Sequence, residues 1–423
     1  MQVSKHNIIS KIQDRNDYII VNALSGQADI LTQQEHDLLL AGQDTDNKDF
    51  WQRGYLVDPA AEKNLYRQKY LDFLDEREDG EAQLFFVPTY ACNFKCAYCY
   101  QDGYKNEPNG LNTEVIDAFF SYVNQTFSLK KHYITLFGGE PLLNAPKYRE
   151  NILYFLTRAR ELGKSVSIVT NGYNLQSYLP YLHQRDIREI QVTLDGIGHA
   201  HDTRRPLLSG EQTYQAIVQG IDAALKAGFT INLRVVVDAG NIDELPKLAK
   251  LASDQGWTSN PLFKTQLGRN YELHYCQDEQ NKLYTRLELY KQLYNIIKEH
   301  PGFVNFHKPA FSISKFLFDN GKMPAPLFDS CPGTKNEWAF DYTGKMYACT
   351  ATVGKHGEEL GSFYPKPEKH ADRIAQWEER DVLSIHECKQ CNMQLICGGG
   401  CAAVAKNNSG KLQAPDCRPH ANY

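Results

Sequence analysis

Short apolar runs alternate with longer amphipathic segments through the middle of the chain. The runs are LFFV (84–87), YITLF (133–137), SVSIV (165–169), EIQVTL (189–194) and INLRVVV (231–237), with LFKTQL (262–267) as a less regular sixth. Segments of helical period follow them, the first being VIDAFFSYVNQTF after Asn112 or Thr113 as cap. This alternation is typical of parallel strands joined by crossover helices. We therefore predict an α/β fold, a partial (β/α)6 TIM-like barrel.

Polar and small residues follow the ends of these predicted strands. The first strand leads into a cysteine loop and the others into GGEP (138–141), TNG (170–172) and DG (195–196). In a barrel of parallel strands all carboxyl ends lie on one face, where active sites assemble. The four short motifs therefore predict a single site, although two adjacent glycines alone could be a plain tight turn.

Composition narrows the possible partners. The 423 residues carry a formal net charge of -5, and acidic and basic residues are interspersed. No basic run of the kind that nucleic acid or a membrane surface requires is present. The first residues have no apolar export signal, and no apolar stretch of about 18 residues occurs. We expect a cytoplasmic protein with no nucleic-acid partner and no membrane partner.

The cysteines indicate metal chemistry. There are 11, clustered at 92–99 and 331–417 with Cys276 between the clusters. In a reducing compartment such clusters are more typical of metal sites than of disulfides. Cys92, Cys96 and Cys99 form the pattern C-x3-C-x2-C. Three thiolates on a 4Fe-4S cluster leave one iron open to bind a small molecule.

This pattern, with Tyr98 before the last cysteine, resembles the signature of the radical S-adenosylmethionine (SAM) superfamily. The resemblance implies that Cys92, Cys96 and Cys99 are catalytic and hold a 4Fe-4S cluster whose open iron binds SAM. One electron would then cleave SAM to a 5′-deoxyadenosyl radical.

The same resemblance assigns cofactor contacts. Gly138, Gly139 and Glu140 match the family motif that holds the methionine amino group, for which a carbonyl and a carboxylate are suitable acceptors. Thr193 matches a position that touches the ribose or carboxylate, and Arg205 matches a recurrent arginine. For these last two residues a structural role, as a strand threonine and a scaffold arginine, remains an alternative.

The C-terminal cysteines form a second group. Their arrangement resembles the SPASM domain, which binds auxiliary 4Fe-4S clusters, so that three clusters are expected in total. The resemblance assigns an outer cluster to Cys388, Cys391, Cys397 and Cys417, and an inner cluster to Cys331, Cys349 and Cys401. Cys276 is a possible fourth ligand of the inner cluster, and Asp329 a possible oxygen ligand. The alternative is that Cys276 is a free thiol and that one iron of the inner cluster is open to a substrate thiol. A zinc site remains an alternative.

The predicted domains are an N-terminal α+β module (1–80), the radical SAM barrel (81–300) and a cysteine-rich SPASM domain (301–423). In the N-terminal module we expect a hairpin about Ser25 and Gly26, a helix begun by the capping box TQQE (32–35), and a further strand in WQRGYLVD. The module resembles leader-peptide-binding modules of peptide maturases; a structural lid is the alternative. Acidic DFLDERED (72–79) is expected to be a solvated linker.

The function that the resemblance favours is that of an enzyme that modifies a ribosomally synthesised precursor peptide or small protein by thioether or carbon-carbon crosslinking, with flavodoxin or ferredoxin as electron donor. The resemblance also covers anaerobic sulfatase maturases, which form formylglycine. Those enzymes carry an aspartate directly after the Gly-x4-Cys cysteine, where this chain has Thr350. A non-catalytic electron carrier or zinc scaffold is the alternative of another class, although a carrier has no use for the GGEP motif.

Overall fold

The computed structural model describes residues 2–42, 47–101, 103–104, 110–269 and 283–417. The chain divides into two compact units. One unit comprises Gly80–Lys308 and Gly333–Ala375, and the other Met1–Asp79, Pro309–Pro332 and Gln376–Tyr423. The C-terminal third of the chain is therefore shared between both units. The predicted functional ranges 1–80, 81–300 and 301–423 remain a prediction, because these units divide the chain by contacts and not by function.

The first unit contains the predicted barrel. Its six parallel strands lie in the order β11-β10-β9-β8-β7-β6. They are β6 (Ala82–Val87), β7 (His132–Leu136), β8 (Val166–Thr170), β9 (Ile187–Thr193), β10 (Ile231–Val237) and β11 (Phe263–Arg269). Each predicted apolar run lies within or overlaps one of these strands, so the expected partial barrel is confirmed.

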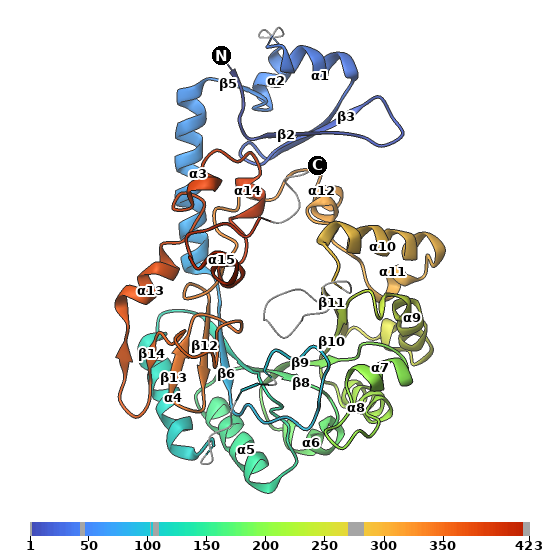
Figure 1. The fold of residues 1–423 in the computed structure, drawn as a ribbon, viewed down its shortest axis with the longest axis vertical. Coiled ribbons are helices and arrows are strands. Elements are labelled where there is room, and N and C mark those ends of the chain that lie inside the picture. The colour runs from blue at the N-terminus through green and yellow to red at the C-terminus, as the bar shows by residue number, and fades with distance from the viewer. Residues whose placement is uncertain (1, 43–46, 102, 105–109, 270–282, 418–423) are drawn as a thin grey trace. The chain divides into compact units, whose positions relative to one another are not determined.

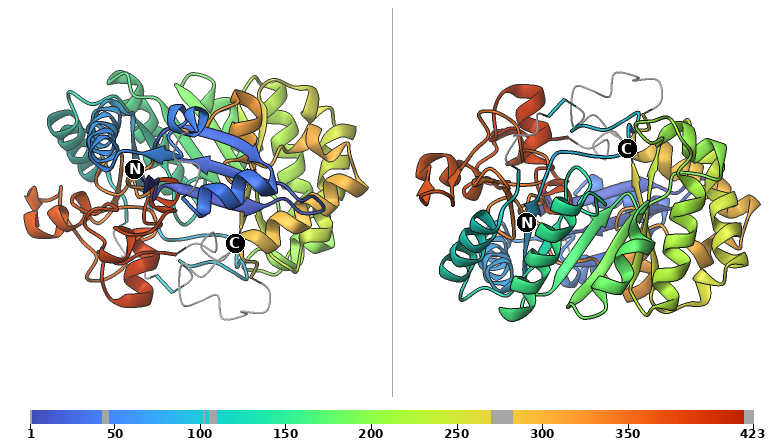
Figure 2. Two further views of the ribbon diagram at one scale, coloured as in Figure 1. Left: turned by 90° about the horizontal axis from the view of Figure 1, so that it is seen from above. Right: turned by 90° about the horizontal axis from the view of Figure 1, so that it is seen from below.

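Helices follow the strands and lie along the outer side of their arc (Figure 1). They are α4 (Thr113–Thr126), α5 (Pro146–Glu161), α6 (Leu175–Leu182), α7 (His199–Arg204), α8 (Tyr214–Lys226), α9 (Leu245–Asp254), α10 (Arg286–Glu299) and α11 (Phe303–Phe306). The Asn112 side chain accepts a hydrogen bond from the Val115 backbone, which makes Asn112 the cap of α4. Phe86 of β6 packs against Phe119 and Phe155 at ring-centroid distances of 4.6 and 4.9 Å. Figure 2 shows the strands and helices from two further directions.

A small antiparallel extension completes the sheet of this unit. β12 (Glu337–Asp341) pairs in parallel with β6, and β13 (Lys345–Tyr347), β14 (Gly361–Ser362) and β15 (Glu368–Lys369) follow in antiparallel order. The segment that contains Cys349 thus continues directly from the barrel sheet. α13 (Ala371–Glu378) spans the division between the units.

The second unit begins with an α+β module, as expected. β2 (Asn7–Lys11), β3 (Tyr18–Asn22) and β4 (Gln27–Leu31) form an antiparallel meander, and β1 (Gln2–Val3) pairs with β5 (Leu56–Val57). The hairpin between β3 and β4 and the capping box of Thr32 and Glu35 before α1 (Gln33–Leu40) are confirmed. The remaining helices are α2 (Lys48–Gln52), α3 (Pro59–Asp79), α12 (Ser314–Asn320), α14 (Gln394–Cys397) and α15 (Ala402–Ser409).

The expected linker at 72–79 is wrong. These residues form the last two turns of α3, a helix of 21 residues. Its interior lacks glycine, and Leu, Asp, Glu and Arg can extend a helix once its other face is packed. That packing comes from Phe328, which lies 5.1 Å from the Tyr66 ring, 5.2 Å from Tyr70 and 5.6 Å from Phe73. The acidic charges occupy the solvated side of a packed helix.

Candidate active site

A cavity of about 470 Å³ lies inside the arc of barrel strands and reaches the loops that follow them. Its walls include most of the cofactor-binding residues that the motifs predicted: Cys92, Cys96, Cys99, Gly138, Gly139, Thr193 and Arg205. Segments that lie far apart in the sequence thus face one space. The roles of these residues as ligands or cofactor contacts remain predictions.

The cysteine loop is held from two sides. The Phe94 backbone donates to the Cys92 sulfur over 3.4 Å, and the Asn171 amide donates to the same sulfur over 3.9 Å. Asn171 follows β8, so the predicted TNG motif supports the cysteine loop directly. Burial, with a smaller contribution from Glu140, raises the pKa of Cys92 to about 12. The thiol therefore keeps its proton unless a metal replaces it.

The GGE motif packs against the same loop. Gly139 has a φ of +50°, and a Cβ there would lie 2.4 Å from the Ala91 carbonyl oxygen. The next residue, Glu140, donates its backbone N–H to that oxygen over 2.9 Å. Only glycine allows this close approach, because any side chain would collide with the backbone that carries the cysteines.

Glu140 is buried behind the cavity wall and joins two loops. Its carboxylate accepts hydrogen bonds from the Leu142 backbone at 2.7 Å, the Thr170 hydroxyl at 2.7 Å and the Asn171 backbone at 2.6 Å. Burial raises the pKa of this carboxyl group, and the three hydrogen bonds oppose the rise. Glu140 therefore fixes the ends of β7 and β8 relative to each other. Its expected contact with the methionine amino group remains a prediction.

Tyr98, Asp195 and Arg205 form a hydrogen-bonded chain beside the cysteines. Arg205 donates to the Tyr98 hydroxyl over 2.5 Å, and this hydroxyl donates to Asp195. Asp195 is fully buried and also accepts from the Val236 backbone over 2.9 Å. Burial and the adjacent Asp195 raise the pKa of Tyr98, so its hydroxyl remains a donor. The arginine predicted to touch the cofactor is thus anchored to the aromatic residue of the cysteine motif.

Among the cavity residues that the sequence analysis did not assign, two make hydrogen bonds around the cysteine loop. Gln101 accepts a hydrogen bond from the Gly139 backbone over 2.9 Å, so it links the cysteine loop to the GGE loop. Tyr100 donates to the Thr350 carbonyl over 3.2 Å. Both residues follow Cys99 immediately, and this adjacency was the one available signal. Because Thr350 also lines the cavity, Cys349 lies next to the wall of the site.

The remaining cysteines fall in both units. Cys388, Cys391, Cys397 and Cys417 line one small cavity of about 50 Å³, which matches the expected outer set. Burial and the neighbouring thiols raise the pKa of Cys388 to about 11. Cys331 and Cys401 belong to the same unit, and Cys349 belongs to the barrel unit. Cys276 lies outside the described residues.

The Cys331 segment is fixed by local hydrogen bonds. Asp329 accepts from the Cys331 backbone over 2.9 Å, and the Ser330 backbone donates to the Gly398 carbonyl over 2.9 Å. Cys401 donates its backbone N–H to Asp416 over 3.1 Å. The cysteine loops are thus ordered by backbone and carboxylate contacts, and the role of Asp329 as an oxygen ligand remains a prediction.

Within the described residues, no three His, Cys, Asp or Glu side chains converge closely enough to hold a single metal ion. The thiolates of a 4Fe-4S cluster each bind a different iron and stand further apart than ligands of one ion. The arrangement of Cys92, Cys96 and Cys99 around a shared cavity is compatible with such a cluster.

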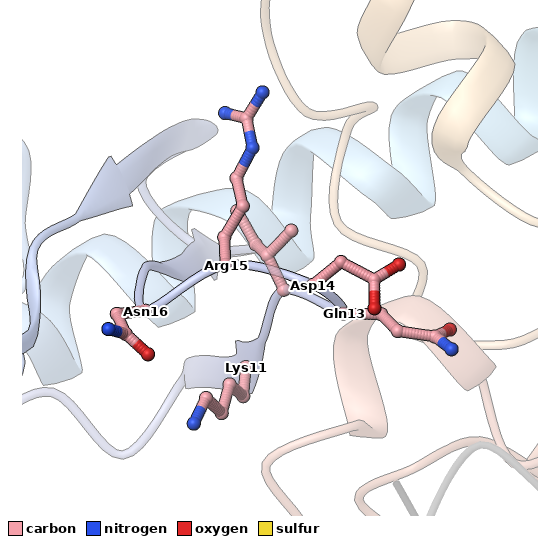
Figure 3. A pocket seen from close by; sticks show the side chains of 6 residues that line it. Lys11, Gln13, Asp14, Arg15 and Asn16 are labelled. Atoms are coloured by element: carbon pink, nitrogen blue, oxygen red, sulfur yellow. The ribbon is translucent and has the colours of Figure 1, made fainter.

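Two other hollows lie in the second unit. One follows the β2–β3 turn and is lined by Lys11, Ile12, Gln13, Asp14, Arg15 and Asn16, whose labelled side chains point in different directions (Figure 3). This exposed turn brings no groups together. The other, of about 510 Å³, is lined by residues of the N-terminal module that include Trp51, Leu56 and Glu62.

Comparison with known proteins agrees with this geometry. Residues 86–252 match the model of the Radical SAM superfamily, so this part of the chain carries a radical SAM domain. This range runs from β6 to α9 and includes every residue that was predicted to contact the first cluster or SAM. Enzymes of this superfamily use a 4Fe-4S cluster and SAM. None of the described helices is long and apolar enough to cross a membrane.

Among curated proteins, the chain is 24% identical over 346 residues to the mycofactocin maturase MftC of Mycolicibacterium smegmatis, covering 80% of this chain and 82% of that protein. It is 29% identical over 168 residues to the GTP 3′,8-cyclase of Actinobacillus pleuropneumoniae, but spans only 47% of that enzyme. Similarity to the maturase therefore covers four fifths of this chain, whereas similarity to the cyclase, over 40% of the chain, is too short to include both cysteine-rich regions.

Solved structures share the fold, among them the following two. One is anSMEcpe with bound AdoMet and the Cp18Cys peptide, with a TM-score of 0.60, 17% identity and coverage of 81% of this chain and 95% of that one. The other is Streptococcus suis SuiB bound to precursor peptide SuiA, with a TM-score of 0.56, 13% identity and coverage of 98% of each chain.

Proposed function

We propose that this protein is a radical SAM enzyme that modifies a ribosomally synthesised peptide. The observation that carries the proposal is the shared cavity of the three cysteines, the GGE loop, Thr193 and Arg205. The similarity to MftC over most of both chains supports a peptide substrate. A non-catalytic electron carrier has no use for a cavity of this size and polarity beside its cluster.

The residues present fit the cofactors of the superfamily. Cys92, Cys96 and Cys99 would hold the cluster, and the cavity in front of them would take SAM. When bound, these groups supply a 5′-deoxyadenosyl radical after one-electron reduction. Arg205, fixed by Tyr98, would orient the cofactor, and the buried loops around Glu140 keep the cysteines in place.

The auxiliary cysteines support an oxidative reaction. Cys388, Cys391, Cys397 and Cys417 share one cavity and would hold the outer cluster. Cys349 precedes Thr350, whose carbonyl accepts from Tyr100 next to Cys99. A substrate radical that forms a new bond must lose a second electron, and an inner cluster ligated by Cys349 would lie beside the site where that electron arises. Flavodoxin or ferredoxin would supply the first electron.

Thr350 argues against a sulfatase maturase. It lines the cavity at the position where the sulfatase maturase pattern has an aspartate, and its neutral hydroxyl cannot take a proton as a carboxylate does. The structural similarity to anSMEcpe, at 17% identity, supports the fold alone. Formylglycine formation is therefore the second candidate.

The N-terminal module would bind the leader part of the precursor. Its cavity of about 510 Å³ beside Trp51 is large enough for peptide side chains. Deleting residues 1–80 is a poor test, because α3 covers Phe328 in the same unit. We expect Trp51→Ala to weaken precursor binding, whereas Leu40→Ala, on an exposed part of α1, leaves it unchanged.

The test of the proposed function is a peptide reaction. The reconstituted protein is incubated anaerobically with SAM, dithionite and each short peptide encoded beside its gene, and the products are analysed by tandem mass spectrometry. Loss of two hydrogen atoms with an internal crosslink is expected. Formylglycine in a neighbouring sulfatase would establish the second candidate instead.

A further inference from the structure

The interior of the barrel is polar where side chains of alternate strand residues point inward. Gln83, Thr135, Ser167, Gln191, Arg234 and Gln266 all line the cavity. Apolar side chains normally fill the interior of a closed barrel of this kind. A polar interior therefore indicates a polar ligand. The charged side chains of the cavity wall determine which charge that ligand carries.

Three arginines line this cavity, and two of them have partners. Arg205 donates to the Tyr98 hydroxyl, and Arg269 donates to the Tyr284 carbonyl over 2.5 Å. The side chain of Arg234, in the middle of β10, makes no hydrogen bond or ion pair within the part of the chain that the structure describes. It is the one arginine of the cavity wall whose guanidinium is left without a described partner.

The acidic residue of the cavity wall is already neutralised. Glu189 forms an ion pair with Lys264 and accepts from the Asn232 amide over 3.4 Å. It therefore has a cation of its own, and it does not balance Arg234.

The absence of a side chain at Gly268 leaves space for the guanidinium of Arg234. This glycine lies in β11 and its φ is not in the left-handed region. Backbone conformation therefore does not explain it, and glycine weakens a strand interior. A Cβ at this position would lie 3.1 Å from Nη2 and 3.4 Å from Cζ of Arg234. The missing side chain makes room for the guanidinium over the strand.

We propose that Arg234 binds a carboxylate of the peptide substrate, and so holds the reacting segment in the cavity beside the cysteines. The carboxylate is either the C-terminus of the peptide or an Asp or Glu side chain. A planar guanidinium with free donors is suited to two parallel hydrogen bonds to such a group. The inference rests on the proposed function for the identity of the ligand as a peptide.

The test measures binding and not turnover, so that it can fail independently of the proposed function. Saturation-transfer difference NMR is recorded on the anaerobic holoenzyme with saturating SAM, whose own carboxylate then occupies its site. The probes are N-acetyl-alanine and its amide for the C-terminal source, and N-acetyl-aspartate amide and N-acetyl-asparagine amide for the side-chain source. We expect at least one acid to bind roughly tenfold more tightly than its matched amide.

Two variants assign this preference to the site. Arg234→Gln removes the charge, and Gly268→Val places a side chain where the guanidinium lies; both should abolish the preference. Arg188→Gln, which removes an outward-facing arginine paired with Glu81, should retain it. Iron content of each variant reports whether the clusters have assembled.

The outcomes separate the alternatives. A stronger response to one acid identifies the source of the carboxylate. Equal binding of acids and amides by the parent enzyme, or a preference that persists in Arg234→Gln, would overturn the proposal. A preference that appears only without SAM would also overturn it, because Arg234 would then serve the carboxylate of SAM.

Discussion

The guanidinium of Arg205 donates a hydrogen bond to the hydroxyl of Tyr98 over 2.5 Å. Arg205 directly follows α7, and Tyr98 stands directly before the last cysteine of the C-x3-C-x2-C motif. The same hydroxyl donates to Asp195, which follows β9. The aromatic residue of the motif thus does more than pack: it connects the cysteine loop to two later loops of the barrel.

Tyr98→Phe should destabilise the protein. It removes a donor from the fully buried Asp195 and an acceptor from Arg205, at a cost of about 1–3 kcal/mol. Chemical unfolding of the cluster-free protein measures this. Tyr154→Phe is the matched control, because that hydroxyl contacts an exposed aspartate, Asp117, and its loss should change the free energy of unfolding little. Equal effects of the two variants would show that the buried hydrogen bonds of Tyr98 contribute nothing to the free energy of unfolding.

Gly344→Ala should destabilise the hairpin that leads to Cys349. Gly344 has a φ of +87°, and a Cβ would lie 2.4 Å from the Tyr364 carbonyl oxygen. Gly357→Ala is the control, since Gly357 has a φ of +84° with nothing within 4 Å of an added Cβ. Both variants place alanine in a left-handed backbone conformation, which destabilises each of them. Because of the additional clash, Gly344→Ala should lower the free energy of unfolding by roughly 1–3 kcal/mol more than Gly357→Ala. Similar melting temperatures would contradict this account of the turn.

The buried His201 should make stability depend on pH. Burial, with smaller contributions from Arg205 and Arg204, lowers the pKa of His201 to about 3. The unfolded chain takes up this proton below pH ~6.5 while the folded chain does not. Protonation of the unfolded chain therefore does not lower the free energy of unfolding above pH ~6.5. As the pH falls from there toward 3, the free energy of unfolding decreases by at most about 1.4 kcal/mol per pH unit.

Unfolding of the parent and of His201→Gln between pH 5 and 7.5 tests this prediction. The parent should lose stability more steeply than the variant as the pH falls. Parallel curves would mean that His201 is protonated in the folded protein, or that it is accessible to solvent.

The outer cluster should depend on the four cysteines that share a cavity. Cys391→Ala should remove the iron of one cluster, about four atoms per chain, and leave the other clusters' spectra unchanged. Cys276→Ala is the informative comparison, because it affects the inner cluster only if Cys276 is its fourth ligand. Full iron content in Cys391→Ala would refute the assignment of Cys391.

Local patterns in the sequence predicted the barrel because each strand of β6–β10 is a short apolar run followed by an amphipathic helix. They also predicted that the cysteine, GGE and TNG motifs meet, because parallel strands bring their carboxyl ends to one face. The acidic end of α3 was misread, since its helical state depends on Phe328, about 250 positions further along the chain. Gln101, Tyr100 and Arg234 could not be assigned, because their contacts are made with residues far away in the sequence.

The division of the C-terminal region was also beyond local patterns. Cys331 and Cys349 appear as one motif in the sequence, but they belong to different compact units. The reason is that β12 pairs with β6 in the barrel sheet, which draws the segment around Cys349 into the first unit. Such pairing over about 250 positions leaves no periodic signal.

The most direct test of the account is cleavage of SAM. Protein reconstituted anaerobically with iron and sulfide, then reduced with dithionite, should convert SAM to 5′-deoxyadenosine, measured by liquid chromatography and mass spectrometry. Cys92→Ala, Cys96→Ala and Cys99→Ala should each abolish the product, because each removes one ligand of the cluster with the open iron. A variant with all three cysteines replaced by alanine that still forms 5′-deoxyadenosine would contradict the central claim.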